Sequence, residues 1–178
     1  MTSLMRSLVA LSLLSASLAF AGWTQQGDGS ATFDAKGPAG FKIHGDAKKL
    51  TVTDDGKTLS VTLTLKDLDT DNDLRNKHMF EDIGAEQFPK MVLSVPLEAL
   101  KVPEDGKSLD AEVTGTLNMH GQDKATPFKY TASCKAGVCT IDSSANVNVG
   151  DHGIKIRSYL GITVKPDIVI GAKFTVKK

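Results

Sequence analysis

The stretch that decides the fold is residues 59–79, which read LSVTLTLKDLDTDNDLRNKHM. Its first half alternates. Leucine or valine occupies every odd position from 59 to 65, and serine, threonine or lysine occupies the even positions from 60 to 66. A hydrophobic period of two places the apolar side chains on one face of a strand and the polar side chains on the other. This half of the stretch therefore predicts a half-buried β-strand.

The second half of the stretch is polar and predicts a strand end that turns into a short helix. Asp69, Thr70 or Asp71 can cap this helix, because their side-chain oxygens accept hydrogen bonds from the free N–H groups of a first turn. The basic side chains between positions 75 and 78 lie towards the C-terminal end, where the helix dipole favours positive charge. A regular strand thus delivers charged groups to the rim of a sheet.

The rest of the chain repeats the alternating pattern between turn signals such as Gly37-Pro38 and Asp105-Gly106. About eight strands result, over residues 31–35, 41–52, 59–65, 91–95, 109–119, 128–134, 139–149 and 167–176. No strand–helix–strand rhythm interrupts them. We predict an all-β fold, an eight-stranded antiparallel barrel with one short helix after the third strand. A closed barrel of this size holds its own side chains or one small ligand.

Two small residues lie on the inward face of the longest predicted strand, Ala111 and Gly115. They either leave room inside the barrel for a ligand or mark close packing and a bend in the strand. The sequence leaves both interpretations open.

The first 21 residues have the pattern of a cleavable signal peptide. Arg6 precedes an uncharged stretch from Leu8 to Phe20, and Ala19-Phe20-Ala21 offers a small-x-small cleavage site ahead of Gly22. The apolar stretch is too short to favour spanning a bilayer. We therefore predict a signal peptide over 1–21, one barrel domain over 22–178, and an exported periplasmic protein without stable membrane insertion.

The charge balance is close to neutral. The chain has 21 basic and 21 acidic residues, and only Arg6 of these lies within the predicted signal peptide, so the exported part has a formal net charge of −1. A chain with this balance has no overall electrostatic attraction for nucleic acid or for an anionic membrane. A neutral or amphiphilic partner fits better.

The only two cysteines, Cys134 and Cys139, are predicted to form a disulfide bond. A four-residue hairpin loop sets them opposite each other on paired strands, and directly paired positions lie within disulfide reach. An oxidising compartment would preserve such a bond. We interpret it as a structural link between two strands, because the C-x-x-C spacing of redox-active pairs is absent.

No recognisable catalytic or metal-binding motif is present in the sequence. The run of residues 69–73 begins like a calcium-binding loop, but Leu74 stands where that loop needs glycine and Phe80 where it needs glutamate. The four histidines are far apart in sequence and have no metal-ligand spacing. The residues alone thus predict no enzyme, no metal and no cofactor.

Three segments resemble the YceI-like family of bacterial polyisoprenoid-binding proteins. They are residues 68–79 with the following Phe88-Pro89, residues 113–121 with Lys124 and Pro127, and residues 157–162. Their order and approximate spacing hold across nearly the whole exported chain. Two positions depart from the family pattern as we read it: Gly29 stands where a histidine is frequent, and Ala47 where an aromatic residue is frequent.

The resemblance implies a lipocalin-like barrel whose interior holds a long amphiphile, such as a polyisoprenoid, an isoprenoid quinone or a fatty-acyl lipid. Burial of its hydrocarbon chain would stabilise the complex by about 0.8 kcal/mol per CH₂. The candidate interior residues are Phe33, Phe41, Ile43, Leu63, Leu65, Val113, Leu117, Phe128, Tyr130, Ile141 and Phe174. The candidate head-group residues are Arg75, His78, His120 and Arg157.

We expect a periplasmic carrier of an isoprenoid-type lipid. Two alternatives stay open at this point: a hydrolase or isomerase with a histidine and aspartate site at the barrel rim, and a stress or interaction module with a filled interior and no ligand. A second copy of the chain, as a homodimer, is a further partner that the sequence leaves open.

Overall fold

The computed structural model describes residues 22–158, 161 and 163–178. The signal-peptide prediction for 1–21 and three positions of the 157–162 motif lie outside these residues. The described part forms ten strands, one α-helix and four short 3₁₀-helices. These are β1 (Thr24–Gln25), β2 (Ser30–Lys36), η1 (Pro38–Gly40), β3 (Lys42–Ala47), β4 (Thr51–Asp54), β5 (Thr58–Thr64), η2 (Leu65–Asp67), α1 (Asp73–Asp82), β6 (Lys90–Pro96), η3 (Leu97–Ala99), β7 (Ser108–Met119), β8 (Gln122–Lys135), β9 (Val138–Asn148), η4 (Val149–His152) and β10 (Asp167–Lys177).

All ten strands form one curled antiparallel sheet in the order β3-β2-β10-β9-β8-β7-β6-β5-β4, with β1 added beside β10. The antiparallel fold with one helix is confirmed, whereas the strand count is ten instead of eight. The strand expected over 41–52 divides into β3 and β4, which belong to opposite ends of the sheet. Strand β1 has only two residues, too few to produce a periodic signal.

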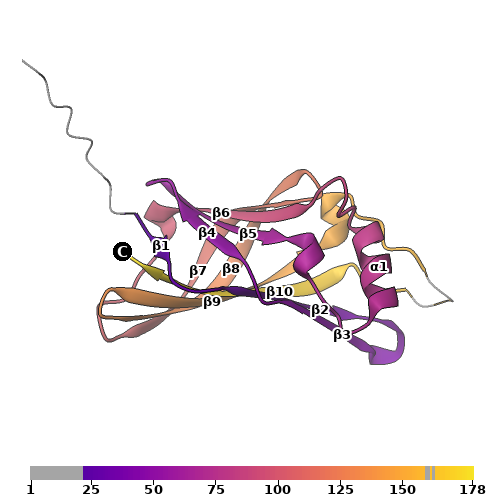
Figure 1. Cartoon of the computed structure of the whole chain (residues 1–178), viewed down its shortest axis with the longest axis horizontal. Coiled ribbons are helices and arrows are strands. Elements are labelled where there is room, and N and C mark those ends of the chain that lie inside the picture. Colours follow the sequence, from indigo (N-terminus) through magenta and orange to yellow (C-terminus); the bar gives the residue numbers. More distant parts are fainter. Residues whose placement is uncertain (1–21, 159–160, 162) are drawn as a thin grey trace, which may run out of the picture.

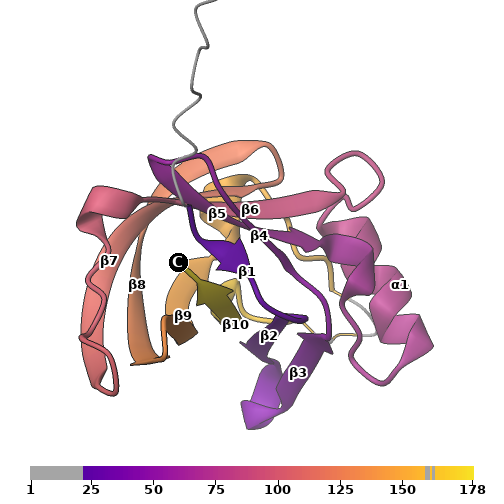
Figure 2. The ribbon, with the colours of Figure 1, turned by 60° about the vertical axis from the view of Figure 1, so that its left-hand side comes forward.

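The two end strands, β3 and β4, do not pair with each other, so the barrel is closed along this seam by separate contacts (Figures 1 and 2). At one end, the amide group of the Gln25 side chain bridges the seam with two hydrogen bonds to backbone groups of Leu50 and Val52. Its Nε2 donates to the Leu50 carbonyl at 2.9 Å and its Oε1 accepts from the Val52 N–H at 2.7 Å. At the other end, Asp46 and Asp69 exchange two backbone hydrogen bonds of 2.8 and 2.9 Å.

Helix α1 begins after Asn72, whose side chain accepts the Arg75 N–H at 2.9 Å. The prediction that Asp69, Thr70 or Asp71 caps the helix is therefore wrong. Asp69 instead accepts from the Asp71 N–H and from the Asn76 side chain, which bonds back from within the helix. The Asn76 amide is the main reason that the pKa of Asp69 lies below its ordinary range, with the Asp71 N–H second.

The interior of the barrel is filled at the end that holds β1 and the C-terminus. Val176, which pairs with Gln25 of β1, is buried there, and further along the barrel Leu117 and Phe128 are buried in the same core. Gly115 belongs to this packing. A Cβ at this position would lie 2.6 Å from the Leu93 side chain and 3.0 Å from the Ser94 carbonyl oxygen. The glycine thus allows β6 and β7 to approach closely. At Gly115 the interpretation as close packing therefore holds, and the residue does not leave room for a ligand.

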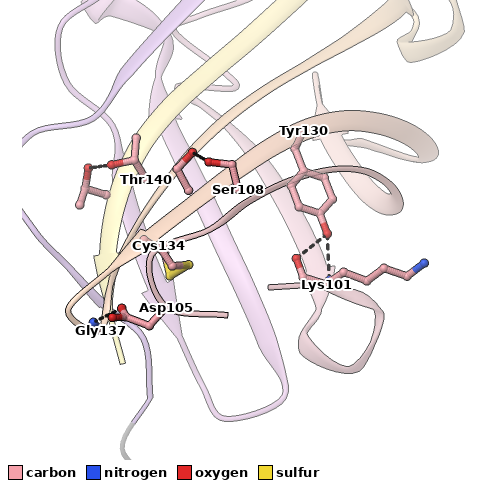
Figure 3. The surroundings of a disulfide bond; sticks show 10 residues. Lys101, Asp105, Ser108, Tyr130, Cys134, Gly137 and Thr140 are labelled. Atoms are coloured by element: carbon pink, nitrogen blue, oxygen red, sulfur yellow. Dashed lines mark hydrogen bonds between the residues drawn. A yellow bond between two sulfur atoms is a disulfide. The ribbon is translucent and has the colours of Figure 1, made fainter. Parts of the chain in front are cut away.

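The disulfide between Cys134 and Cys139 is confirmed, and it joins β8 to β9 beside their hairpin turn (Figure 3). Both cysteines are buried. In the same region the Tyr130 hydroxyl accepts the Lys101 N–H at 2.8 Å and donates to the Lys101 carbonyl at 3.0 Å (Figure 3). These bonds fasten the segment after η3 to the filled end of the barrel.

Candidate lipid-binding cavity

The end of the barrel that carries α1 is hollow. A cavity of about 440 Å³ lies there, within the range of about 300–1,000 Å³ typical of small-molecule sites. Its wall is almost entirely apolar. Residues from β2, β3, β5, η2, α1, β6, β7, η4 and β10 contribute to it, together with residues just before β3, on either side of α1 and in the coil between η4 and β10. They are Thr32, Phe33, Ala35, Phe41, Ile43, Leu63, Leu65, Leu68, Thr70, Asn72, Leu74, Arg75, His78, Met79, Asp82, Ile83, Met91, Met119, Val149, Ile154, Ile156, Arg157, Val164, Ile168 and Ile170.

The cavity reaches the molecular surface between η1 and α1. Phe41 and Leu74 both line it, and they are 56% and 63% exposed. Phe41 follows η1 at the tip of the β2–β3 hairpin, and Leu74 lies in the first turn of α1. Both elements lie at the same end of the barrel, away from β1 and the C-terminus (Figure 1).

The inner wall is shaped by an aromatic ring that covers a glycine. Phe33 and Gly45 are directly paired across β2 and β3. A Cβ at Gly45 would lie 2.3 Å from the Phe33 ring, so only glycine leaves room for the ring in this position. The glycine is part of a regular ladder and marks no bulge. The Phe33 ring can therefore lie across β3 and form part of the cavity wall.

The polar groups of the cavity gather around α1. Arg75 donates from Nε to the Thr70 hydroxyl at 3.0 Å and from Nη2 to the Thr70 carbonyl at 2.9 Å. Thr70 is buried and in turn donates to the Asn76 side chain at 2.6 Å. Both acceptors are uncharged oxygen atoms of Thr70, so these bonds fix the position of the Arg75 guanidinium without neutralising its positive charge. Arg75 thereby brings a positive charge to the cavity wall.

Arg157 connects the coil after η4 to the C-terminal half of α1. Its Nη2 lies 3.1 Å from Glu81 Oε2, and its Nε donates to Asp82 Oδ1. Since Arg157 and Asp82 both line the cavity, this ion pair is part of the wall. Its partners are partly exposed, and we expect it to position the coil more than to stabilise the fold.

The structure brings together eight of the fifteen residues that the sequence nominated for the ligand. The residues that line the cavity are Phe33, Phe41, Ile43, Leu63, Leu65, Arg75, His78 and Arg157. Those that do not line it are Val113, Leu117, His120, Phe128, Tyr130, Ile141 and Phe174. The six members of the second group other than His120 are buried in the core.

His120 lies in the turn between β7 and β8, away from the cavity lining. Its ring packs on Phe88 with a centroid separation of 4.4 Å, and its Nδ1 lies 3.2 Å from the His152 carbonyl oxygen. His78 thus lines the cavity, whereas His120 does not. No group of three or more His, Cys, Asp or Glu side chains within the described ranges is arranged to hold a metal ion.

Sequence reasoning nominated Arg75, His78 and Arg157 but none of the apolar cavity residues of α1 and of the coil between η4 and β10. Met79 and Ile83 belong to the helical segment, whose apolar residues are few. Ile154, Ile156 and Val164 belong to the irregular coil, which has no hydrophobic period to mark an inward face. The alternation of Ile154 and Ile156 with polar neighbours is the one sequence pattern in this coil, and it is too short to predict that these residues line a cavity.

The comparison with protein families identifies the chain. The YceI-like domain matches residues 11–176. The chain belongs to the YceI-like domain family. Over 99 residues it is 31% identical to a UPF0312 protein of Enterobacter sp. (strain 638), and this alignment spans 54% of the chain and 40% of that relative.

Three solved structures share the fold. A polyisoprenoid-binding domain from Saccharophagus degradans, implicated in plant cell wall breakdown, aligns with a TM-score of 0.72 at 12% identity, over 87% of this chain and 97% of that one. BcnA of Burkholderia cenocepacia aligns with a TM-score of 0.65 at 15% identity, over 83% and 95%. The YceI protein of Campylobacter jejuni reaches 0.54 at 15% identity, over 99% and 93%. At these identities the likeness concerns the fold.

None of the described helices has the length and hydropathy that crossing a bilayer requires.

Proposed function

We propose that this protein is a binding or carrier protein for a long-chain amphiphile, a polyisoprenoid, an isoprenoid quinone or a related lipid, and that it acts in the periplasm after removal of residues 1–21. The observation that carries the proposal is the apolar cavity of about 440 Å³, which reaches the surface beside α1. The Saccharophagus degradans domain of similar fold, which binds polyisoprenoid, supports the same class of ligand.

The chemistry of the cavity suits binding more than catalysis. A hydrocarbon chain needs an apolar wall, and each CH₂ removed from water contributes about 0.8 kcal/mol. The polar groups at the cavity, among them Arg75 and His78, suffice to orient a head group. A filled interaction module is disfavoured by the cavity itself, and a rim enzyme that uses both His78 and His120 is disfavoured because His120 does not line the cavity.

The test is native mass spectrometry of protein purified from the periplasmic fraction, with an organic extract analysed in parallel. We expect the polypeptide to begin at Gly22 and to carry one additional mass, recovered in the extract as an isoprenoid or acyl compound. Protein that is bare, and that takes up neither prenols nor quinones supplied in detergent, would refute the carrier function.

A variant that fills the cavity sharpens this test. Ala35 is buried and lines the cavity, so Ala35→Phe should occupy space that the amphiphile needs and abolish its uptake. Ala99→Phe adds the same ring at an exposed position of η3, outside the cavity, and should leave uptake unchanged. Circular dichroism and thermal unfolding of both variants separate loss of binding from loss of folding.

A further inference from the structure

The mouth of the cavity combines exposed apolar side chains with a local excess of positive charge. Of the four large apolar side chains that are exposed in the described part of the chain, Phe41 and Leu74 lie at this mouth. Single exposed apolar residues are ordinary on protein surfaces. Here, however, two of them from different elements flank the opening of one apolar cavity.

Three lysines from three different segments lie close together beside Phe41. Lys36 and Lys42 are directly paired across β2 and β3. Lys165 reaches the same place from the coil before β10, where its N–H donates to the Lys36 carbonyl at 2.7 Å. All three side chains belong to exposed residues. A basic cluster is thus assembled by the fold in a chain whose total charge is close to zero.

The tip of the hairpin and the coil beside it carry no acidic residue, whereas Asp34, Asp46 and Asp167 lie further along β2, β3 and β10. Residues 35–45 and 154–166 contain no aspartate or glutamate. On α1, Asp73 lies in the first turn, while Glu81 and Asp82 bond Arg157. Next to the lysines on β2, Asp34 bonds His44 at 2.9 Å. The tip of the hairpin is therefore basic, and the helix side of the mouth carries both charges.

We infer that the tip of the β2–β3 hairpin, residues 36–42, docks the cavity mouth on a membrane surface that contains anionic lipids. Lysines attract an anionic leaflet, and an aromatic side chain such as Phe41 enters the boundary between head groups and acyl chains. Docking in this orientation places an apolar cavity against the bilayer, where an amphiphile passes between them without crossing water. The inference rests on the proposed carrier function for its purpose, but vesicle docking is measured independently of cargo.

The experiment is co-sedimentation of residues 22–178 with vesicles of phosphatidylcholine alone or mixed with phosphatidylglycerol. This segment contains every described strand and lacks the apolar stretch 8–20 that would bind vesicles by itself. We expect binding to the anionic vesicles that weakens with added salt. Each lysine near an anionic leaflet strengthens binding by about fivefold, so Lys36→Gln combined with Lys42→Gln should weaken it by about 25-fold.

A matched control uses two lysines at the opposite end of the barrel. Lys135 and Lys177 both pair with Val138 beside the β8–β9 hairpin, and their double replacement by glutamine removes the same charge. It should leave vesicle binding nearly unchanged. Equal losses for the two double variants, or binding that ignores phosphatidylglycerol, would overturn the inference.

A second readout separates this inference from the carrier function. The variant with Lys36→Gln and Lys42→Gln leaves the cavity lining intact, so it should take up a prenol from detergent as the unchanged protein does. Normal uptake combined with lost vesicle binding supports docking. Normal uptake by a protein that never binds anionic vesicles refutes docking and leaves the carrier function standing.

Discussion

Replacing by alanine one buried leucine that lines the cavity and one that does not tests whether the interior is hollow at one end and filled elsewhere. Leu117 and Leu63 are suitable because both are buried on strands, at 1% and 4% exposure, and only Leu63 lines the cavity. Each replacement removes three carbon atoms, which costs about 2.4 kcal/mol at 0.8 kcal/mol per carbon. Any difference between the two must then come from packing.

The packing contribution depends on how much new empty space each replacement creates. Around Leu117 the side chain is enclosed on all sides, so its removal adds a void at about 24 cal/mol per Å³, and the total cost should reach about 3–4 kcal/mol. Leu63 already faces empty space and makes fewer contacts to lose. Its replacement should cost about 2–3 kcal/mol.

The assay is urea unfolding of both variants after removal of any bound lipid, since bound lipid would stabilise the folded state by mass action. The unfolding slope with denaturant should stay the same, and the midpoint should fall further for Leu117→Ala than for Leu63→Ala. Equal costs, or a larger cost for Leu63→Ala, would refute the division of the interior into a filled and a hollow end.

Three further predictions concern the contacts that hold the ends of the barrel. Replacing Cys134 and Cys139 together by alanine should lower the free energy of unfolding by about 2 kcal/mol, because the closed loop is short; urea unfolding measures this, and no change would refute a stabilising role. Tyr130→Phe removes both hydrogen bonds to Lys101 and should cost about 1 kcal/mol in the same assay, with a neutral result speaking against their contribution. The pKa of Asp69 is lowered in the folded state, so the stability from its ionised form is complete above its ordinary value of 3.8 and is lost as the pH falls through the lower folded value. The decline in stability below about pH 4 should accordingly be shallower for Asp69→Asn, and equal declines would contradict the assignment.

The sheet could be predicted from the sequence because its signal is local. Strands β7, β8 and β9 alternate over eleven or more residues, and their buried positions follow the predicted phase. Strand β1 and the division between β3 and β4 escaped prediction for a physical reason. Both depend on which strands meet at the seam, and this is decided by contacts between residues far apart in the chain, such as Gln25 with Leu50.

The cavity was only partly predictable because alternation identifies an inward face without identifying its position along the barrel. Leu63 and Leu117 have the same inward phase, yet one lines the cavity and the other fills the core. The deciding factor is what stands opposite each side chain across the barrel. At the hollow end the opposite wall is made by α1 and by an irregular coil, and neither has a period that reveals its inward residues.

The position of the seam bears on how large a ligand the cavity can accept. Between β3 and the segment before α1, the described backbone hydrogen bonds across the seam are the two between Asp46 and Asp69, whereas neighbouring strands within the sheet are joined by ladders. Breaking two such bonds costs about 1–3 kcal/mol. Burial of two to four additional CH₂ groups, at about 0.8 kcal/mol each, offsets that cost. We therefore expect the cavity to widen along this seam only for a ligand long enough to bury these additional groups, so that a long-chain amphiphile should bind more tightly than a short one.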